Sequence, residues 1–338
     1  MKTKLTILLV LCVSMTSQAA VAVFSPDGKF VTLLPLAKTT ADLWKVDLKT
    51  KGIENIQLGL PKDLNVTSLA LGAEGETIVL AGEAIYAHDA KGTKKLCDSI
   101  GVKDAHDLTI SPPKATNGMA DWIIISGIDK EYPDRHIFYG RKPGGKSFSP
   151  VFGRRIDQAG KGAFTTDGQF FFQADNTIWE GSFSCIADEG PILNSVGIAP
   201  LAYCDSSISN TGRYSVSNTI AVAGNYVYTA LSGRHGDDIL LRMTMPAKAP
   251  DNNGTDSGEA LEAHYKMQAK VLSSVKVLER DTHILVLAAI VVKGEERVFY
   301  LVRPHYDRVR MMLWTSSTEE GEIIGEYKEE EEETKPTK

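Results

Sequence analysis

Charged side chains that could bind a ligand gather in three short segments, 127–135, 153–157 and 232–238, which lie between hydrophobic runs. Their carboxylates, guanidinium groups and one imidazole have mixed signs, which suits a polar, specific partner better than a membrane or a polyanion. The sequence shows no structural role for these side chains. We therefore interpret nine of them as candidate binding residues: Asp129, Asp134, Arg135, Arg154, Arg155, Arg234, His235, Asp237 and Asp238.

Two segments carry residue types that ligate metal ions, but neither has a complete ligand set. His235, Asp237 and Asp238 combine imidazole and carboxylate donors and lack an identifiable fourth partner. The segment that begins at Asp251 has oxygen donors at alternate positions and Glu262 at the twelfth, but its sixth position is not the glycine that a calcium loop needs. We predict no metal and no cofactor, with calcium at 251–262 left open as an alternative.

Two common catalytic signatures are absent from the sequence. It contains no G-x-S-x-G and no H-E-x-x-H, which argues against the hydrolase elbow and the common zinc-protease motif. Isolated histidines usually serve strand and loop structure, and the histidines of this chain are scattered: His88, His106, His136, His235, His264, His283 and His305. We assign no catalytic residue.

The N-terminal segment 1–19 has the pattern of a signal peptide. Lys2 and Lys4 precede an apolar run at 5–13, and Ser17 and Ala19 place small residues at the −3 and −1 positions of a cleavage point. The apolar run has nine residues, whereas a membrane-spanning helix needs about twenty. We therefore expect a periplasmic or secreted protein without a membrane span.

The charge of the chain is concentrated at its C-terminal end. The net charge is −6, and the segment 315–338 alone carries nine Glu against three Lys. The body at 20–314 is close to neutral, so it lacks the basic surface that a nucleic-acid-binding protein needs. Because like charges repel, we expect 315–338 to be a disordered acidic tail.

Two recurring patterns predict the elements that position the charged segments. Turns at 25–28, 73–76 and 165–168 precede hydrophobic runs, and two of them contain Asp-Gly, which is typical of a β-hairpin. An aliphatic residue followed by a large apolar one recurs at intervals of 41 to 61 residues, beginning at Leu43, Ile85, Ile137, Ile178, Ile239 and Val298. Many short strands with such a period predict an all-β fold, a β-propeller.

We expect six blades, at 20–60, 65–98, 105–152, 160–195, 217–245 and 272–314. Seven blades are the alternative, because 196–216 is unassigned. The apolar run from Ile284 to Val292 is predicted to be a buried strand. Helical periodicity is confined to 258–270, which predicts a short helical insertion between the last two blades.

The first blade resembles a known repeat. The segment Phe24-Ser25-Pro26-Asp27-Gly28-Lys29-Phe30 is similar to the WD40-like repeat of TolB-type β-propellers, in which an S-P-D-G-K/R turn joins the first two strands of each blade. The segment 42–47 likewise resembles the third strand of such a blade. The resemblance implies blade geometry and implies no particular chemistry.

Two classes of function remain open. In the first, the protein is an exported binding or scaffold module that presents a charged loop face to a protein or small polar ligand. The loop between the second and third strands of a blade shares a face with the connection to the next blade, so all three charged segments are expected there. The alternative is a propeller-type hydrolase or lactonase with a metal or an acid–base pair at the central mouth. The lack of a dense His/Asp/Glu motif favours the binding module.

Three cysteines remain after removal of the leader, and we predict a disulfide between Cys185 and Cys204, with Cys97 left as a thiol. This bond would close an 18-residue loop, which contributes about 3 kcal/mol in the chain-entropy model. Titration of denatured, unreduced mature protein should detect one thiol. Three thiols would contradict the pairing.

Overall fold

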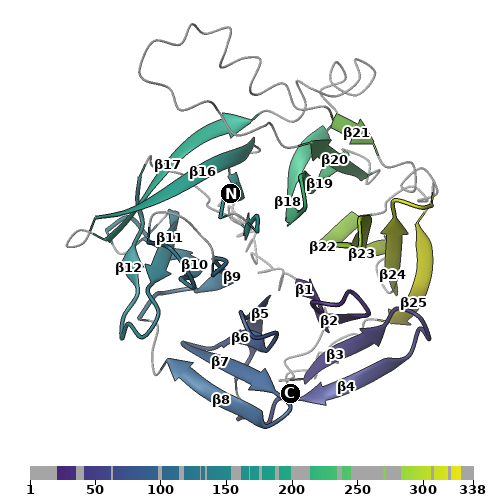
Figure 1. The fold of residues 1–338 in the computed structure, drawn as a ribbon, viewed down its shortest axis with the longest axis horizontal. Coiled ribbons are helices and arrows are strands. Elements are labelled where there is room, and N and C mark those ends of the chain that lie inside the picture. Colours follow the sequence, from purple (N-terminus) through teal and green to yellow (C-terminus); the bar gives the residue numbers. More distant parts are fainter. Residues whose placement is uncertain are drawn as a thin grey trace, which may run out of the picture.

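Twenty-five β-strands form six separate sheets in the part of the chain that the computed structural model describes. The described residues are 21–35, 42–61, 64–97, 101–113, 118–129, 131–133, 135–153, 161–166, 168–174, 177–186, 190–198, 214–233, 238–244, 269–271, 283–305, 308–318 and 321–328. The sheets follow one another around a central axis in chain order, as the blades of a propeller do (Figure 1). The predicted all-β propeller with six blades is confirmed.

Apart from β13 in blade 4, the strands of each blade are antiparallel neighbours and run in chain order outward from the axis. Blades 1 and 2 comprise β1 (Val21–Phe24), β2 (Phe30–Leu34), β3 (Asp42–Asp47), β4 (Ile53–Gln57), β5 (Val66–Leu71), β6 (Thr77–Ala81), β7 (Ala84–Asp89) and β8 (Gly92–Cys97). Blade 3 comprises β9 (His106–Ile110), β10 (Ile123–Ile128), β11 (His136–Arg141) and β12 (Ser149–Pro150).

Blade 4 has a fifth strand. It comprises β14 (Gly162–Phe164), β15 (Phe170–Ala174), β16 (Thr177–Ile186) and β17 (Gly190–Ile198), and β13 (Phe152–Gly153) pairs in parallel with the outer edge of β17. Blades 5 and 6 comprise β18 (Tyr214–Ala223), β19 (Tyr226–Gly233), β20 (Ile239–Thr244), β21 (Ala269–Val271), β22 (His283–Val292), β23 (Glu295–His305), β24 (Arg308–Thr315) and β25 (Glu322–Lys328).

Blade 6 differs from the prediction in its boundaries. It was expected at 272–314 but its strands run from His283 to Lys328. The aliphatic–aromatic marker at Val298 lies in the second strand of this blade, whereas the other markers lie in third strands. The buried strand predicted from Ile284 to Val292 is present as β22, the inner strand, and the turn that follows it places Lys293 and Gly294 at φ values of 53° and 84°.

Three further predictions concern the tail, the helical segment and the unassigned segment 196–216. β25 lies within the segment predicted to be a disordered tail. It pairs with β24, buries Ile324, and places Glu326 beside Arg308 and Arg310 at 3.1 and 3.0 Å. Of the predicted helical segment, only its last two residues are described, and they belong to β21. Residues 196–198 belong to β17, whereas 199–213 and 329–338 lie outside the described residues.

The Asp-Gly turn of blade 1 forms as its sequence predicts. The Ser25 hydroxyl donates to Asp27 Oδ1 at 2.7 Å, and the Lys29 backbone N–H donates to the same oxygen at 3.1 Å. The hydrogen bonds from Ser25 and Lys29 hold the pKa of Asp27 at about 2. Gly28 has a φ of 66°, and a Cβ there would lie 2.5 Å from the Val292 side chain of blade 6. Glycine is therefore required both by the turn and by the neighbouring blade.

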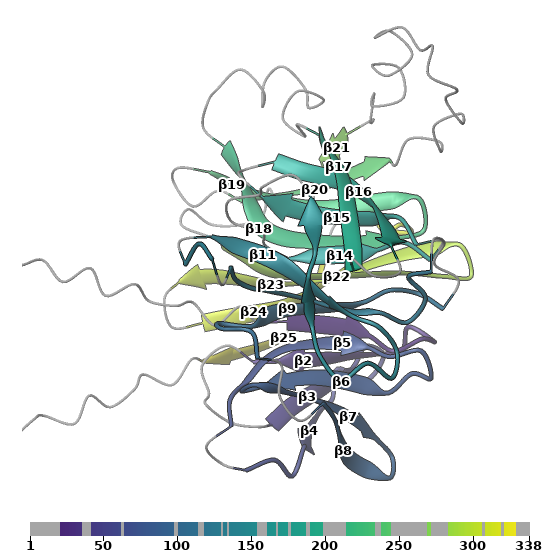
Figure 2. The ribbon, with the colours of Figure 1, turned by 90° about the vertical axis from the view of Figure 1, so that its left-hand side faces the viewer.

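The two faces of the ring carry different connections, and the strands run between these faces in the side view of Figure 2. The loop face carries the loops between second and third strands and the connections between blades. There, the Ile128 N–H donates to the Lys103 carbonyl at 2.9 Å, which ties one such loop to one such connection. The turn face carries the other turns, including Gly28 and Gly75. The loop between β10 and β11 thus lies on the face predicted for it, while residues 154–157 and 234–237 of the other two charged segments lie outside the described residues.

Contacts between blade 1 and blade 6 close the ring. Blade 1 contains only N-terminal strands and blade 6 only C-terminal strands, so no strand is shared between the two ends. A buried cluster joins them, with Phe24, Leu33, Phe299, Met311 and Ile324 among its members. At its edge, Trp44 and Tyr327 pack edge to face at 4.8 Å, and Lys51 pairs with Glu322 at 2.5 Å. Closure therefore depends on side-chain packing.

Substitution of Ile324 by alanine should lower the free energy of unfolding by about 2–5 kcal/mol, because the side chain is 3% exposed within this closing cluster. Ile323→Ala is the matched control on the same strand. Ile323 is 51% exposed, so its loss should change stability by less than about 0.5 kcal/mol. Urea unfolding measures both, and equal effects would show that β25 does not close the ring.

Candidate functional site

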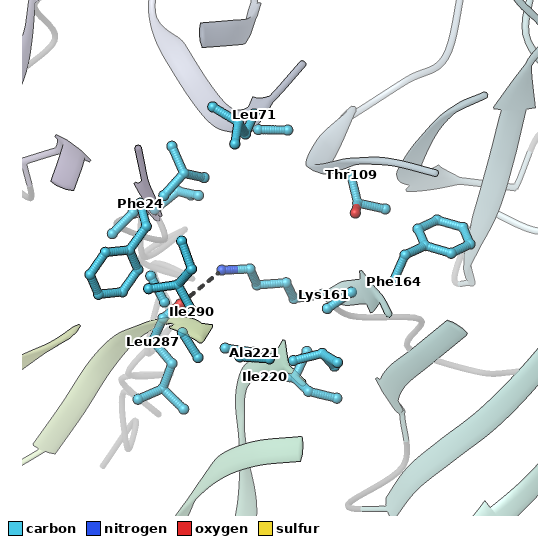
Figure 3. Close-up of a pocket in the computed structure, with 18 of the residues that line it drawn as sticks. Phe24, Leu71, Thr109, Lys161, Phe164, Ile220, Ala221, Leu287 and Ile290 are labelled. Carbon is cyan, nitrogen blue, oxygen red and sulfur yellow. Dashed lines mark hydrogen bonds between the residues drawn. The ribbon is translucent and has the colours of Figure 1, made fainter. Parts of the chain in front are cut away.

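The inner strands of all six blades surround a central cavity of about 440 Å³. Its wall is built almost entirely of Val, Ala, Leu, Ile and Phe, including Phe24, Leu71, Ile220 and Leu287 (Figure 3). The side chains alternate along each inner strand and pack toward the blades on either side, as Phe24 does toward blade 6 and its neighbour Val23 toward blade 2. The inner edge of each of these strands has no strand partner, so backbone polar groups line the cavity beside the apolar side chains.

Lys161 is the one charged residue among the described residues of the cavity wall. It directly precedes β14, at the loop-face end of this strand, and its side chain extends into the cavity (Figure 3). Its ammonium donates to the Leu287 carbonyl of blade 6 at 3.5 Å. Burial among apolar walls lowers the pKa of Lys161, and attraction to the Asp107 carboxylate opposes this shift in part. The cavity thus contains a poorly solvated cation.

A second group of polar side chains lies in blade 3, on the loop face. Asp104, His106 and His136 each offer one possible ligand atom, and these atoms lie within 4.8 Å of one another. We call these three residues the His–Asp cluster. The two imidazole rings meet edge to face with their centroids 5.1 Å apart. Burial, followed by the charge of His106, lowers the pKa of His136.

Backbone geometry places the His–Asp cluster. Asp104 and Asp107 both have positive φ values, 52° and 48°, which aspartate tolerates better than most residues. This bends the connection before β9 so that Lys103 meets Ile128 at the end of β10. A Cβ at Gly127 would lie 2.2 Å from Val102, so glycine permits this close approach. The close approach brings the first residue of β9 near the first residue of β11.

Asp238 has a structural role that the sequence did not reveal. It is 2% exposed, and its Oδ2 accepts the backbone N–H of Ile284 at 2.8 Å, which links blade 5 to blade 6. His283 Nδ1 lies 3.5 Å from Oδ1 of the same carboxylate. Burial raises the pKa of Asp238, although the bond from Ile284 opposes that shift. Asp238 was predicted to bind a partner, and the structure shows that it also links two blades.

Asp129 and Arg135 lie in the loop between β10 and β11. Asp129 Oδ1 accepts the Glu131 N–H at 2.9 Å, and the Asp129 N–H donates to the Arg135 carbonyl at 2.8 Å. The Arg135 guanidinium lies over the Tyr132 ring at 4.5 Å, and Tyr132 is 38% exposed. The described part of this loop therefore presents an aromatic ring beside a cation, held by backbone hydrogen bonds.

The other predicted site residues lie outside the described residues: Asp134, Arg154, Arg155, Arg234, His235 and Asp237. The predicted calcium segment 251–262 and Cys204 lie outside them as well, while Cys185 belongs to β16. Cys97 is a buried thiol in the apolar cluster between blades 2 and 3. The disulfide and the binding roles therefore stay predictions.

The sequence alone did not point to Lys161 or to the His–Asp cluster. A single histidine in a strand usually has only a structural role, so neither His106 nor His136 is distinctive by itself. One signal was present, because His106 and His136 each begin a hydrophobic run of the same blade. Strands that start on the same face bring such residues together. Nothing in the sequence distinguishes Lys161 from a surface lysine.

Comparison with known proteins supports the fold only. No family model and no curated protein matches the chain. Among solved structures, a putative TolB from Agrobacterium tumefaciens has a TM-score of 0.55 at 11% identity and covers 85% of this chain and 89% of its own.

Two further solved structures with a similar fold are of differently named proteins. A gluconolactonase from Xanthomonas campestris has a TM-score of 0.51 at 10% identity over 87% of this chain and 84% of its own. A mutant of AofleA from Arthrobotrys oligospora has a TM-score of 0.52 at 9% identity over 92% and 88%. Likeness at such identity establishes a shared propeller, in agreement with the predicted TolB-like repeat. Separately, none of the described segments forms a helix long and apolar enough to cross a membrane.

Replacement of Lys161 by methionine should stabilise the protein at neutral pH. Because the folded state lowers the pKa of Lys161, the unfolded chain binds more protons, and the penalty is fully present below the folded pKa. The advantage of Lys161→Met should therefore shrink as pH rises from the folded pKa toward that of free lysine. Urea unfolding at pH 7 and pH 10 measures this difference, with the exposed Lys91→Met as control. A pH-independent difference would contradict the assignment.

Proposed function

We propose that this protein is an exported binding module that holds a partner on its loop face. The observation that carries the proposal is the pairing of Tyr132 with Arg135 between β10 and β11, where the Arg135 N–H also donates to the Tyr132 carbonyl at 3.0 Å. Tyrosine and arginine are enriched among the residues that dominate binding energy in protein interfaces. A stacked pair also loses little side-chain freedom when a partner binds, because its geometry is already held.

The position of this pair supports a shared binding surface. The turn that carries it lies on the same face as the end of β19 and the start of β20, and the predicted binding residues Arg234, His235 and Asp237 come between these two strands in the sequence. A face of mixed charge around an aromatic anchor favours a polar, specific protein partner. The signal-peptide pattern supports export, so the partner is expected in the periplasm or outside the cell.

The alternative, a propeller-type hydrolase or lactonase, has less support in the cavity. Acid–base catalysis requires a positioned proton donor or acceptor within hydrogen-bond reach of the substrate. The described residues of the cavity wall include no carboxylate and no imidazole, and their one titratable group is Lys161. The gluconolactonase similarity rests on the fold and carries no residue to this chain.

The test is a pulldown from the exported fraction with mature protein, quantified by mass spectrometry. Tyr132→Ala/Arg135→Ala should weaken capture of the specific partner by about thirtyfold, which corresponds to about 2 kcal/mol. The control, Ile323→Ala/Lys91→Ala, removes an exposed apolar group and a cation from elsewhere on the surface, and should capture the partner as wild type does.

Circular dichroism and urea unfolding establish that both double variants keep the fold. If the folded Tyr132→Ala/Arg135→Ala protein captures every partner at the wild-type level, the β10–β11 turn is ordinary surface and the proposal fails.

A further inference from the structure

We propose that the His–Asp cluster is a site for one borderline divalent cation, Zn²⁺ or a close equivalent. Asp104, His106 and His136 supply two imidazoles and one carboxylate from two segments of blade 3, the connection before β9 and the start of β11. Imidazole donors favour Zn²⁺, Ni²⁺ and Co²⁺, whereas Ca²⁺ and Mg²⁺ favour oxygen ligands. The donor set therefore predicts the class of metal.

An unsatisfied nitrogen points to a missing ligand. His136 Nδ1 is buried and has no hydrogen-bond partner among the described residues. A buried polar atom left in this state costs about 1–3 kcal/mol. Coordination of a cation by this nitrogen would satisfy it. An ion would thus be held by an atom that the fold has already removed from water.

The orientation of His106 is also that of a metal ligand. Its Nδ1 lies 2.7 Å from the Asp104 backbone carbonyl, so the Nδ1–H donates to that oxygen. Nε2 is then the atom that carries the lone pair, and it lies 3.4 Å from Asp107 Oδ2. Two acceptors at this distance repel unless a proton or a metal ion lies between or beside them. An N–H bond to a backbone carbonyl is the usual outer contact of a metal-bound histidine.

The geometry requires only a small adjustment. Ligand atoms in a tetrahedral zinc site lie about 3.3 Å apart, since each bond is about 2.0–2.1 Å long. The three atoms here lie within 4.8 Å of one another, and Asp104 is exposed, so its side chain is able to rotate inward. Three protein ligands leave a fourth position for water or for an atom of a bound partner.

The experiment is isothermal titration of tag-free, metal-stripped mature protein with Zn²⁺ alone, combined with Co²⁺ absorption spectroscopy. Wild type should bind one ion in this site, and Co²⁺ should give the visible bands of a nitrogen–oxygen ligand set. His136→Ala and His106→Ala should each weaken this site by more than the roughly 10–100-fold loss seen when only an outer contact is removed.

His88→Ala is the matched control, because His88 is a partly buried histidine of blade 2 that contacts Thr93 at 2.9 Å and lies outside the cluster. It should keep wild-type affinity and stoichiometry. If the folded His106→Ala/His136→Ala double variant binds as much Zn²⁺ as wild type, or if wild type binds none, the proposal is overturned.

Discussion

The packing of blade 6 against blade 1 is the interaction on which the rest of the structure depends. Each blade is a local antiparallel sheet, but the ring exists only when the two chain ends meet. Since no strand crosses the junction, Phe24, Phe299 and Ile324 hold it by burial, with the Trp44–Tyr327 contact at its rim. If the junction opened, the inner strands would no longer enclose the cavity or hold their loops on one face.

Buried polar links fix adjacent blades relative to one another. Asp238 of blade 5 accepts a hydrogen bond from Ile284 of blade 6, and Tyr228 of blade 5 donates to Glu296 of blade 6 at 2.5 Å. Such buried bonds are costly to leave unmade, so they select one relative position of adjacent blades. Blade 3, which carries Tyr132 and the His–Asp cluster, is held in the same way, because the buried Leu108 N–H donates to the Ser68 hydroxyl of blade 2 at 2.9 Å. Binding there needs little ordering of the protein.

Sequence reasoning could predict the fold because its determinants are local. Asp27-Gly28 specifies a hairpin through its own side chain and backbone, and the marker beginning at Leu43 does belong to a third strand. The predicted boundaries were wrong for blade 6, where Val298 carries the same marker in a second strand. They were also wrong for the tail, where Arg308 and Arg310 neutralise Glu326. Both failures concern the pairing of strands within blade 6, which residue types alone do not specify.

The candidate site was predicted in part, for the same reason. The grouping of charged loops on one face follows from strand order, and Asp129 and Arg135 lie there. The buried state of Asp238, the position of Lys161 in the cavity and the meeting of His106 with His136 depend on contacts between segments distant in the chain. Residue type alone does not show which lysine is desolvated or which histidines are neighbours.

The central claim, that the loop face is the face that meets the partner, is tested most directly by site-specific photo-crosslinking in the exported fraction. A photoreactive residue at the exposed Glu131 position reports on the loop face, and one at the exposed Glu74 position reports on the turn face. The account predicts a discrete adduct from position 131 and none from position 74. Adducts from position 74 alone would contradict it.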